Sequence, residues 1–122
     1  DDKNVEELVA ESLRMQINAA VAASLGLCVF GRSVTDENLE LIANAINDAF
    51  DAGVTPGFIR NIGVETLRLE AAFNSAAGFG EGDDELPAFF HEEPLPPTGK
   101  MARLYSREVN AAMQNLMEAQ SL

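Results

Sequence analysis

The residue in this sequence with the greatest chemical potential is Cys28, the only cysteine among 122 residues. It follows Gly26 and Leu27, where a long apolar helical pattern has to end. A thiolate is a ligand for iron–sulfur clusters and soft metals, and flexible backbone beside a glycine lets it turn toward one. A lone cysteine between Leu27 and Val29 also fits a second interpretation, a small apolar residue in the core. The residues around Cys28 leave both interpretations open.

Other candidate sites in the sequence are incomplete. The acidic run 81–85 lacks the ligand spacing of an EF-hand calcium loop. His91, the only histidine, has Ala88 three residues before it, so the Glu-x-x-His pair of a di-iron bundle is absent. We interpret His91 as an isolated surface histidine. The glycine-rich stretch 78–82 follows a helical pattern, whereas a phosphate-binding loop joins a strand to a helix. The residue pattern therefore defines no catalytic residues.

The net charge of the chain disfavours two classes of binding partner. Twenty acidic and eight basic side chains give a net charge of −12. A nucleic-acid backbone or an anionic membrane surface would be repelled by this charge. We therefore expect neither nucleic acid nor membrane as a partner.

The apolar segments predict a cytoplasmic location. The longest mostly apolar stretch, 19–30, is interrupted by Ser24 and Gly26 and is shorter than the roughly 20 residues that span a bilayer. It lacks the basic region that precedes the apolar part of a secretion signal, and one cysteine permits no internal disulfide. Because the sequence begins with Asp1 and not Met, we expect a piece of a longer protein.

Apolar residues recur at three- and four-residue spacing and predict four longer helices. Asn4 and Glu7 form a capping box at the first helix, and Thr35 or Asp36 is the expected cap of the second. The expected helices cover about residues 4–25, 36–50, 56–77 and 100–118. Their expected buried faces include Phe50, Phe58, Leu69 and Phe73.

Residues 78–99 differ from the rest, since they contain four of the nine glycines and four of the five prolines. We expect irregular structure there, apart from a short helical turn at 87–91. Strand-like alternation is absent from the sequence. The predicted fold is all-α, a single domain over residues 1–122 with orthogonal or bundle-like packing of its helices.

Two segments resemble the C-terminal portion of the aldehyde ferredoxin oxidoreductase family. Residues 23–30 are similar to the family signature Asp-x-x-Gly-Leu-Cys followed by an apolar residue and Phe. The second segment resembles the family run of a leucine-rich helix that ends in Phe-Asn, followed by Gly-Phe, an acidic pair, Leu-Pro and Glu-Pro-Leu. In this chain the run is Phe73-Asn74, Gly78-Phe79, Asp83-Asp84, Leu86-Pro87 and Glu93-Pro94-Leu95.

The resemblance implies a cytoplasmic oxidoreductase that converts aldehydes to carboxylic acids and passes electrons to ferredoxin. Its cofactors are a tungsten or molybdenum bis-pterin and a [4Fe–4S] cluster. Cys28 matches a cluster ligand, with Gly26 and Leu27 in the same cofactor-binding turn. Three further thiolates come from an upstream cysteine cluster in the family, so we expect the isolated chain to lack the cofactors and to be inactive. Ala23 occupies the position of the aspartate that hydrogen-bonds a pterin.

The expected partners are the remaining domains of the parent chain and a ferredoxin-like electron acceptor. We also expect a homodimer through the apolar face of residues 19–31. Two alternatives remain open. One is a stand-alone acidic helical interaction module with Cys28 sealed in its core. The other is a degenerate, non-catalytic subunit without cofactor.

Overall fold

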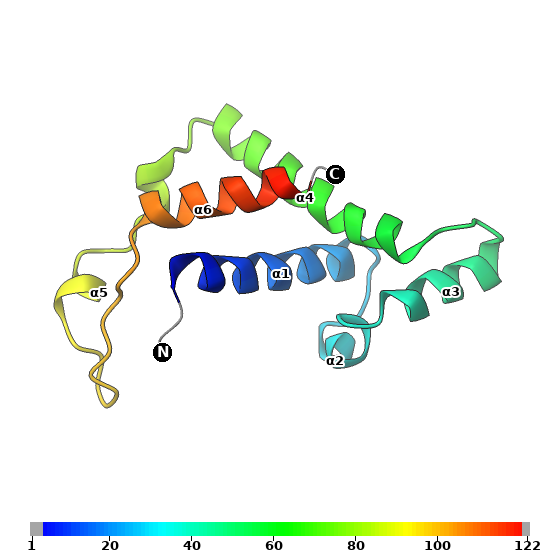
Figure 1. Ribbon diagram of the computed structural model, residues 1–122, viewed down its shortest axis with the longest axis horizontal. Helices are drawn as coiled ribbons and strands as arrows, with labels where there is room; N and C mark the ends of the chain where they lie inside the picture. Colours follow the sequence, from blue (N-terminus) through cyan, green and yellow to red (C-terminus); the bar gives the residue numbers. More distant parts are fainter. Residues whose placement is uncertain (1–3, 121–122) are drawn as a thin grey trace. The chain divides into compact units, whose positions relative to one another are not determined.

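The structure is a computed structural model, and it describes residues 4–120 (Figure 1). Its longer helices are α1 (Val5–Ser24), α3 (Leu39–Phe50), α4 (Pro56–Ala76) and α6 (Ser106–Ala119). Its shorter elements are the 3-10 turns η1 (Val29–Gly31) and η2 (Glu81–Asp84) and the helices α2 (Arg32–Thr35) and α5 (Phe89–Glu92). Residues 4–120 contain no strand, only one antiparallel bridge between Leu95 and Lys100. The all-α prediction is confirmed, including four longer helices and a short one in the Gly/Pro-rich segment.

Within the described residues, the chain divides into two compact units. Ser12–Phe73 form one, here called the central unit. Residues 4–11 and 74–120 belong to the other, here called the terminal unit. None of the helices in the described part of the chain is long and apolar enough to cross a membrane.

The central unit is built on one apolar core. Val21 of α1, Ile42 and Ala43 of α3, and Ile59 of α4 are buried against one another. These positions follow the helical spacing of the sequence, because residues three and four apart share one helix face. Six half-buried apolar residues pack around them: Leu25, Leu27, Leu39, Ile46, Val54 and Ile62.

Gly63 allows α1 and α4 to approach closely. A Cβ at this position would lie 2.4 Å from the carbonyl oxygen of Ile17 and 2.9 Å from Cγ2 of Val21. A glycine inside a helix costs about 1 kcal/mol relative to alanine. Close packing between the two helices therefore accounts for the glycine.

Polar contacts hold the irregular segment of the terminal unit to α6. One carboxylate oxygen of Glu85 accepts from the backbone N–H and from the hydroxyl of Ser106, each at 2.8 Å. The amide of Asn110 donates to Asp84 at 3.1 Å. Both hydrogen bonds from Ser106 hold the pKa of Glu85 below its ordinary value, and the bond from the backbone N–H has the larger effect. Of the described residues in this unit, only Val9 is buried.

The interpretation of His91 as a surface histidine is wrong. Its side chain is only 9% exposed, and its ring stacks on Tyr105 with centroids 4.3 Å apart. Nδ1 lies 3.2 Å from the carbonyl oxygen of Ala102, and Nε2 lies 3.4 Å from Glu85. Sequence spacing gave no sign of these contacts, since 11 residues separate His91 from Ala102.

Two predicted helix starts are wrong. Asn38, not Thr35 or Asp36, caps α3 by accepting from the backbone N–H of Leu41 at 3.2 Å. α6 begins at Ser106 and not near Lys100, because residues 95–100 form a turn closed by a bridge and Ala102 is hydrogen-bonded to α5. The N–H of Leu95 donates to the carbonyl of Lys100 at 2.8 Å, and the N–H of Ala102 donates to the carbonyl of Phe90 at 2.7 Å.

The starts of α1 and α4 and the ends of all four longer helices lie within one residue of the predicted bounds. The backbone N–H of Asn4 donates to Glu7 at 3.2 Å, and that of Glu7 donates to Asn4 at 2.9 Å, as a capping box requires. Thr55 accepts from the N–H of Phe58 at 3.1 Å and so caps α4. The predicted burial of several large residues is wrong, because a stripe is buried only where a neighbour covers it. Phe50, Leu69 and Phe73 are each at least 70% exposed, and Phe58 is more than half exposed.

Candidate functional site

Cys28 directly follows the glycine turn that ends α1. The N–H of Leu27 donates to the carbonyl of Ala22 at 2.8 Å, and the N–H of Gly26 donates to that of Ala23 at 3.2 Å. These two bonds, with Gly26 at φ +67°, form a Schellman motif. Glycine is required here because other residues rarely adopt this backbone conformation.

The backbone on the other side of Cys28 is helical. Cys28 itself is extended, and its carbonyl accepts from the N–H of Gly31 at 2.9 Å. The N–H of Arg32 donates in turn to the carbonyl of Val29. The thiol therefore lies at the junction of two hydrogen-bonded turns.

Cys28 is exposed, whereas Leu27 beside it packs against the core of the central unit. The interpretation of Cys28 as a buried core residue is therefore wrong. The next two side chains are apolar and also exposed, Val29 by 63% and Phe30 by 93%. Contiguous exposed apolar residues of this kind mark contact surfaces for other proteins or domains.

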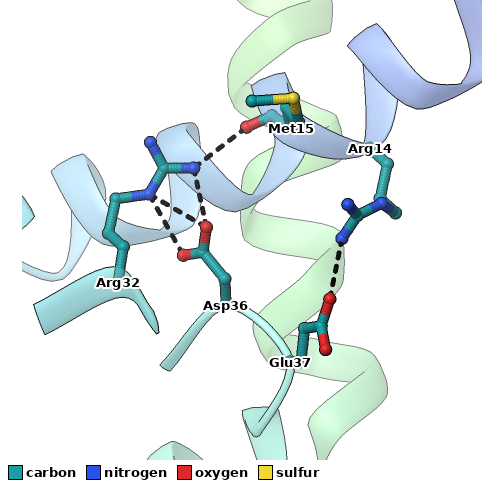
Figure 2. Close-up of polar contacts among 5 residues, drawn as sticks. All are labelled: Arg14, Met15, Arg32, Asp36 and Glu37. Atoms are coloured by element: carbon teal, nitrogen blue, oxygen red, sulfur yellow. Dashed lines mark hydrogen bonds and ion pairs between the residues drawn. The ribbon is translucent and has the colours of Figure 1, made fainter. Parts of the chain in front are cut away.

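Arg32 forms an ion pair within the segment that follows Cys28 and also donates a hydrogen bond to α1 (Figure 2). Nε of Arg32 donates to both carboxylate oxygens of Asp36, at 3.1 and 3.0 Å, and Nη2 lies 2.8 Å from Oδ2. Nη2 also donates to the carbonyl of Met15 at 3.3 Å. A second pair, Arg14 with Glu37 at 3.4 Å, lies nearby and is more exposed. The Arg32–Asp36 pair was not predicted, although opposite charges four residues apart are a known helix signal.

The residues present do not make a complete cluster site. A [4Fe–4S] cluster bound by four cysteines needs four thiolates, and this sequence contains one. Within residues 4–120 no three His, Cys, Asp or Glu side chains lie together as a metal site. Cys28 therefore fits as one ligand, and this chain alone cannot hold the cluster. At the pterin position, Ala23 is exposed and has no polar side-chain atom, so the aspartate contact does not fit.

A groove lies in the terminal unit, in the Gly/Pro-rich segment. It is a mostly apolar groove of about 290 Å³, lined by Phe89, Phe90, Pro94, Leu95, Met101 and neighbouring residues. It brings no reactive or metal-binding side-chain cluster together.

The described chain is all-α, with the exposed thiol of Cys28 just past the end of α1. A family model described as "Aldehyde ferredoxin oxidoreductase, domains 2 & 3" matches residues 2–119. The chain therefore belongs to the aldehyde ferredoxin oxidoreductase family. The match includes the turn of Gly26, Leu27 and Cys28. No curated protein and no solved structure matches the chain significantly.

Proposed function

We propose that this chain is the C-terminal helical part of an aldehyde ferredoxin oxidoreductase-like enzyme, in which Cys28 supplies one thiolate to a [4Fe–4S] cluster. Gly26 and Leu27 hold the turn that presents it. The observation that carries the proposal is the exposure of Cys28 between two hydrogen-bonded turns, in a chain of this family. The tungsten or molybdenum bis-pterin, when bound, supplies the oxidation of aldehydes to carboxylic acids.

The remaining ligands come from other parts of the protein. Three thiolates are missing here, and the exposed Val29 and Phe30 form an apolar surface suited to contact the domain that carries them. In this proposal the helical chain covers the cofactor interface. When bound, the cluster would supply electron transfer to a ferredoxin-like acceptor, and we propose a cytoplasmic location for the enzyme.

One observation favours a second candidate, a related subunit without catalysis. Ala23 cannot make the side-chain contact that the family's aspartate makes with a pterin. A subunit that keeps the cluster ligand but lacks the pterin would tolerate this residue. Metal analysis of the complete protein separates the two candidates, because iron without tungsten or molybdenum supports the non-catalytic subunit.

The proposal is tested in the complete gene product that contains this chain, purified without oxygen. Cys28→Ala is expected to lower the iron content and to remove the electron paramagnetic resonance signal of the reduced cluster. Ser33→Ala, an exposed residue of the same segment, is the matched control and is expected to retain both. An unchanged signal and iron content in Cys28→Ala would overturn the role of Cys28 as a ligand.

For the isolated chain we propose self-association through the apolar face of residues 19–31. Phe30 contributes most to the exposed part of this face, and no other domain is there to cover it. Sedimentation over a range of concentrations is expected to show a dimer that Phe30→Ser weakens. A monomer at every concentration would contradict this expectation.

A further inference from the structure

We infer that Arg32 positions Cys28: Asp36 orients its guanidinium, which donates to the carbonyl of Met15 in α1 and so fastens the turn after the thiol. This inference rests on the proposed function for its meaning in the enzyme. The contacts themselves all lie within the central unit.

The contacts of Arg32 with the carboxylate of Asp36 and with the carbonyl of Met15 are here together called the clasp. The guanidinium contacts both carboxylate oxygens of Asp36 and reaches the carbonyl of Met15 as well (Figure 2). The planar fork of arginine fixes direction as well as distance, which a single-point contact does not. The side chains are only 24% and 23% exposed, so solvent screens the pair less than a surface pair.

The segment has little else to hold it in place. η1 and α2 together contain no buried residue, and neither has a side-chain cap at its start. α2 is four residues long, and a helix this short is not stable by itself in water. Val29, Phe30 and Val34 point their apolar side chains to the surface. The hydrogen bond from Arg32 to the carbonyl of Met15 joins this segment to α1.

The clasp is connected to the thiol through one turn of backbone. The N–H of Arg32 donates to the carbonyl of Val29, and the N–H of Gly31 donates to that of Cys28 at 2.9 Å. On the other side, the Schellman motif at Gly26 already fixes the end of α1. Hydrogen-bonded turns therefore lie on both sides of Cys28. A ligand has to be held within about 0.5 Å of its productive position by the residues behind it.

The test compares two substitutions that remove the same charge from neighbouring residues. Asp36→Asn breaks the clasp, whereas Glu37→Gln breaks the exposed pair with Arg14. In Asp36→Asn, amide hydrogen exchange at Gly31 and Arg32 is expected to rise about tenfold, as loss of a charged hydrogen bond predicts. Arg32→Gln is expected to do the same, and Glu37→Gln is expected to change neither amide. Unchanged exchange in both clasp variants would overturn the inference.

The second measurement uses the complete gene product and separates positioning from general stability. Clasp variants are expected to shift the resonance signal or the reduction potential of the cluster, with the unfolding temperature of the whole protein retained. Faster exchange with an unaltered cluster would overturn the positioning role, even if Cys28→Ala loses iron and the proposed function stands. If Cys28→Ala keeps its iron, the proposed function fails instead.

Discussion

In the central unit, Val21, Ile42 and Ile59 bring three helices onto one apolar core, whereas the terminal unit ties its irregular segment to α6 through Asp84 and Glu85. The first arrangement depends on apolar area removed from water, and this driving force is non-directional. The second depends on a few directional hydrogen bonds with exposed partners. We therefore expect the two units to respond differently to the same class of substitution.

The C-terminal ends of α1 and α4 allow a closer comparison, because both helices end in a Schellman motif. Gly78, at φ +92°, repeats the bonds of Gly26, with the N–H of Phe79 donating to the carbonyl of Asn74 at 3.0 Å. After Gly26 the chain is anchored at once by Leu27, which packs on the core. After Gly78 the next side chain, Phe79, is 61% exposed. The same turn thus leads to a fixed thiol in one unit and to an uncovered aromatic residue in the other.

The largest effect is expected for Gly63→Ala in the central unit. Helix propensity favours alanine by about 1 kcal/mol. The added Cβ would lie 2.4 Å from the Ile17 carbonyl, and overpacking of this severity costs about 3 kcal/mol or more. The net result is a marked loss in the free energy of unfolding, measured by urea titration of the circular dichroism signal.

Gly57→Ala is the matched control in the same helix. Its Cβ would meet only Oγ1 of Thr55, at 3.8 Å. We expect no loss and a gain of up to about 1 kcal/mol from helix propensity. Equal losses in the two variants would show that close packing between α1 and α4 does not set the stability of the central unit.

A smaller effect is expected for Asn47→Ala, at the polar contact that closes the connection between α3 and α4. Oδ1 of Asn47 accepts from the N–H of Val54 at 2.7 Å, and Nδ2 donates to its carbonyl at 2.9 Å. Loss of both leaves two half-buried backbone groups unpaired and costs about 2 kcal/mol. Asn44→Ala, at an exposed position of α3, is the control in the same urea titration. A loss as small as that of the control would contradict the expectation.

The sequence predicted helix faces better than burial, and it predicted the polar contacts poorly. Helical spacing is local information and places Val21, Ile42 and Ile59 on apolar faces. It does not show which part of a face a neighbour covers, so Phe50 and Phe73 are exposed. Glu85 and Ser106 lie 21 residues apart, and no local pattern pairs them. Asp36 was expected to cap α3, but it contacts Arg32 instead. The turn at Gly26 was predictable from glycine chemistry, whereas the exposure of Cys28 depends on which residues cover it.

A still smaller and more local effect is expected for Glu85→Gln in the terminal unit. Hydrogen bonds from Ser106 hold the pKa of Glu85 below its ordinary value in the folded chain. Its carboxylate therefore stabilises the unit above the ordinary pKa, and this stabilisation is lost as the pH falls through the lowered folded-state pKa. The variant is expected to have a weaker Ser106 contact at neutral pH and to lose this acid dependence. Amide exchange at Ser106, followed against pH, measures both.

Glu81→Gln is the control for this variant, since Glu81 is an exposed residue of η2. It is expected to keep the protection of the Ser106 amide and its dependence on pH. If Glu85→Gln shows the same acid dependence as the unmodified chain, another group stabilises the start of α6.

The smallest effect is expected for Glu37→Gln, which removes an exposed ion pair from the unit that has the apolar core. Glu37 is 82% exposed and lies 3.4 Å from Arg14. Solvent screening and the side-chain freedom lost on pairing limit such a pair to about 0.5 kcal/mol or less. The urea midpoint is therefore expected to move little, and less than in Asp36→Asn. A shift as large as that of Asp36→Asn would mean that surface charge, and not the apolar core with its half-buried clasp, stabilises the central unit, and the contrast between the two units would disappear.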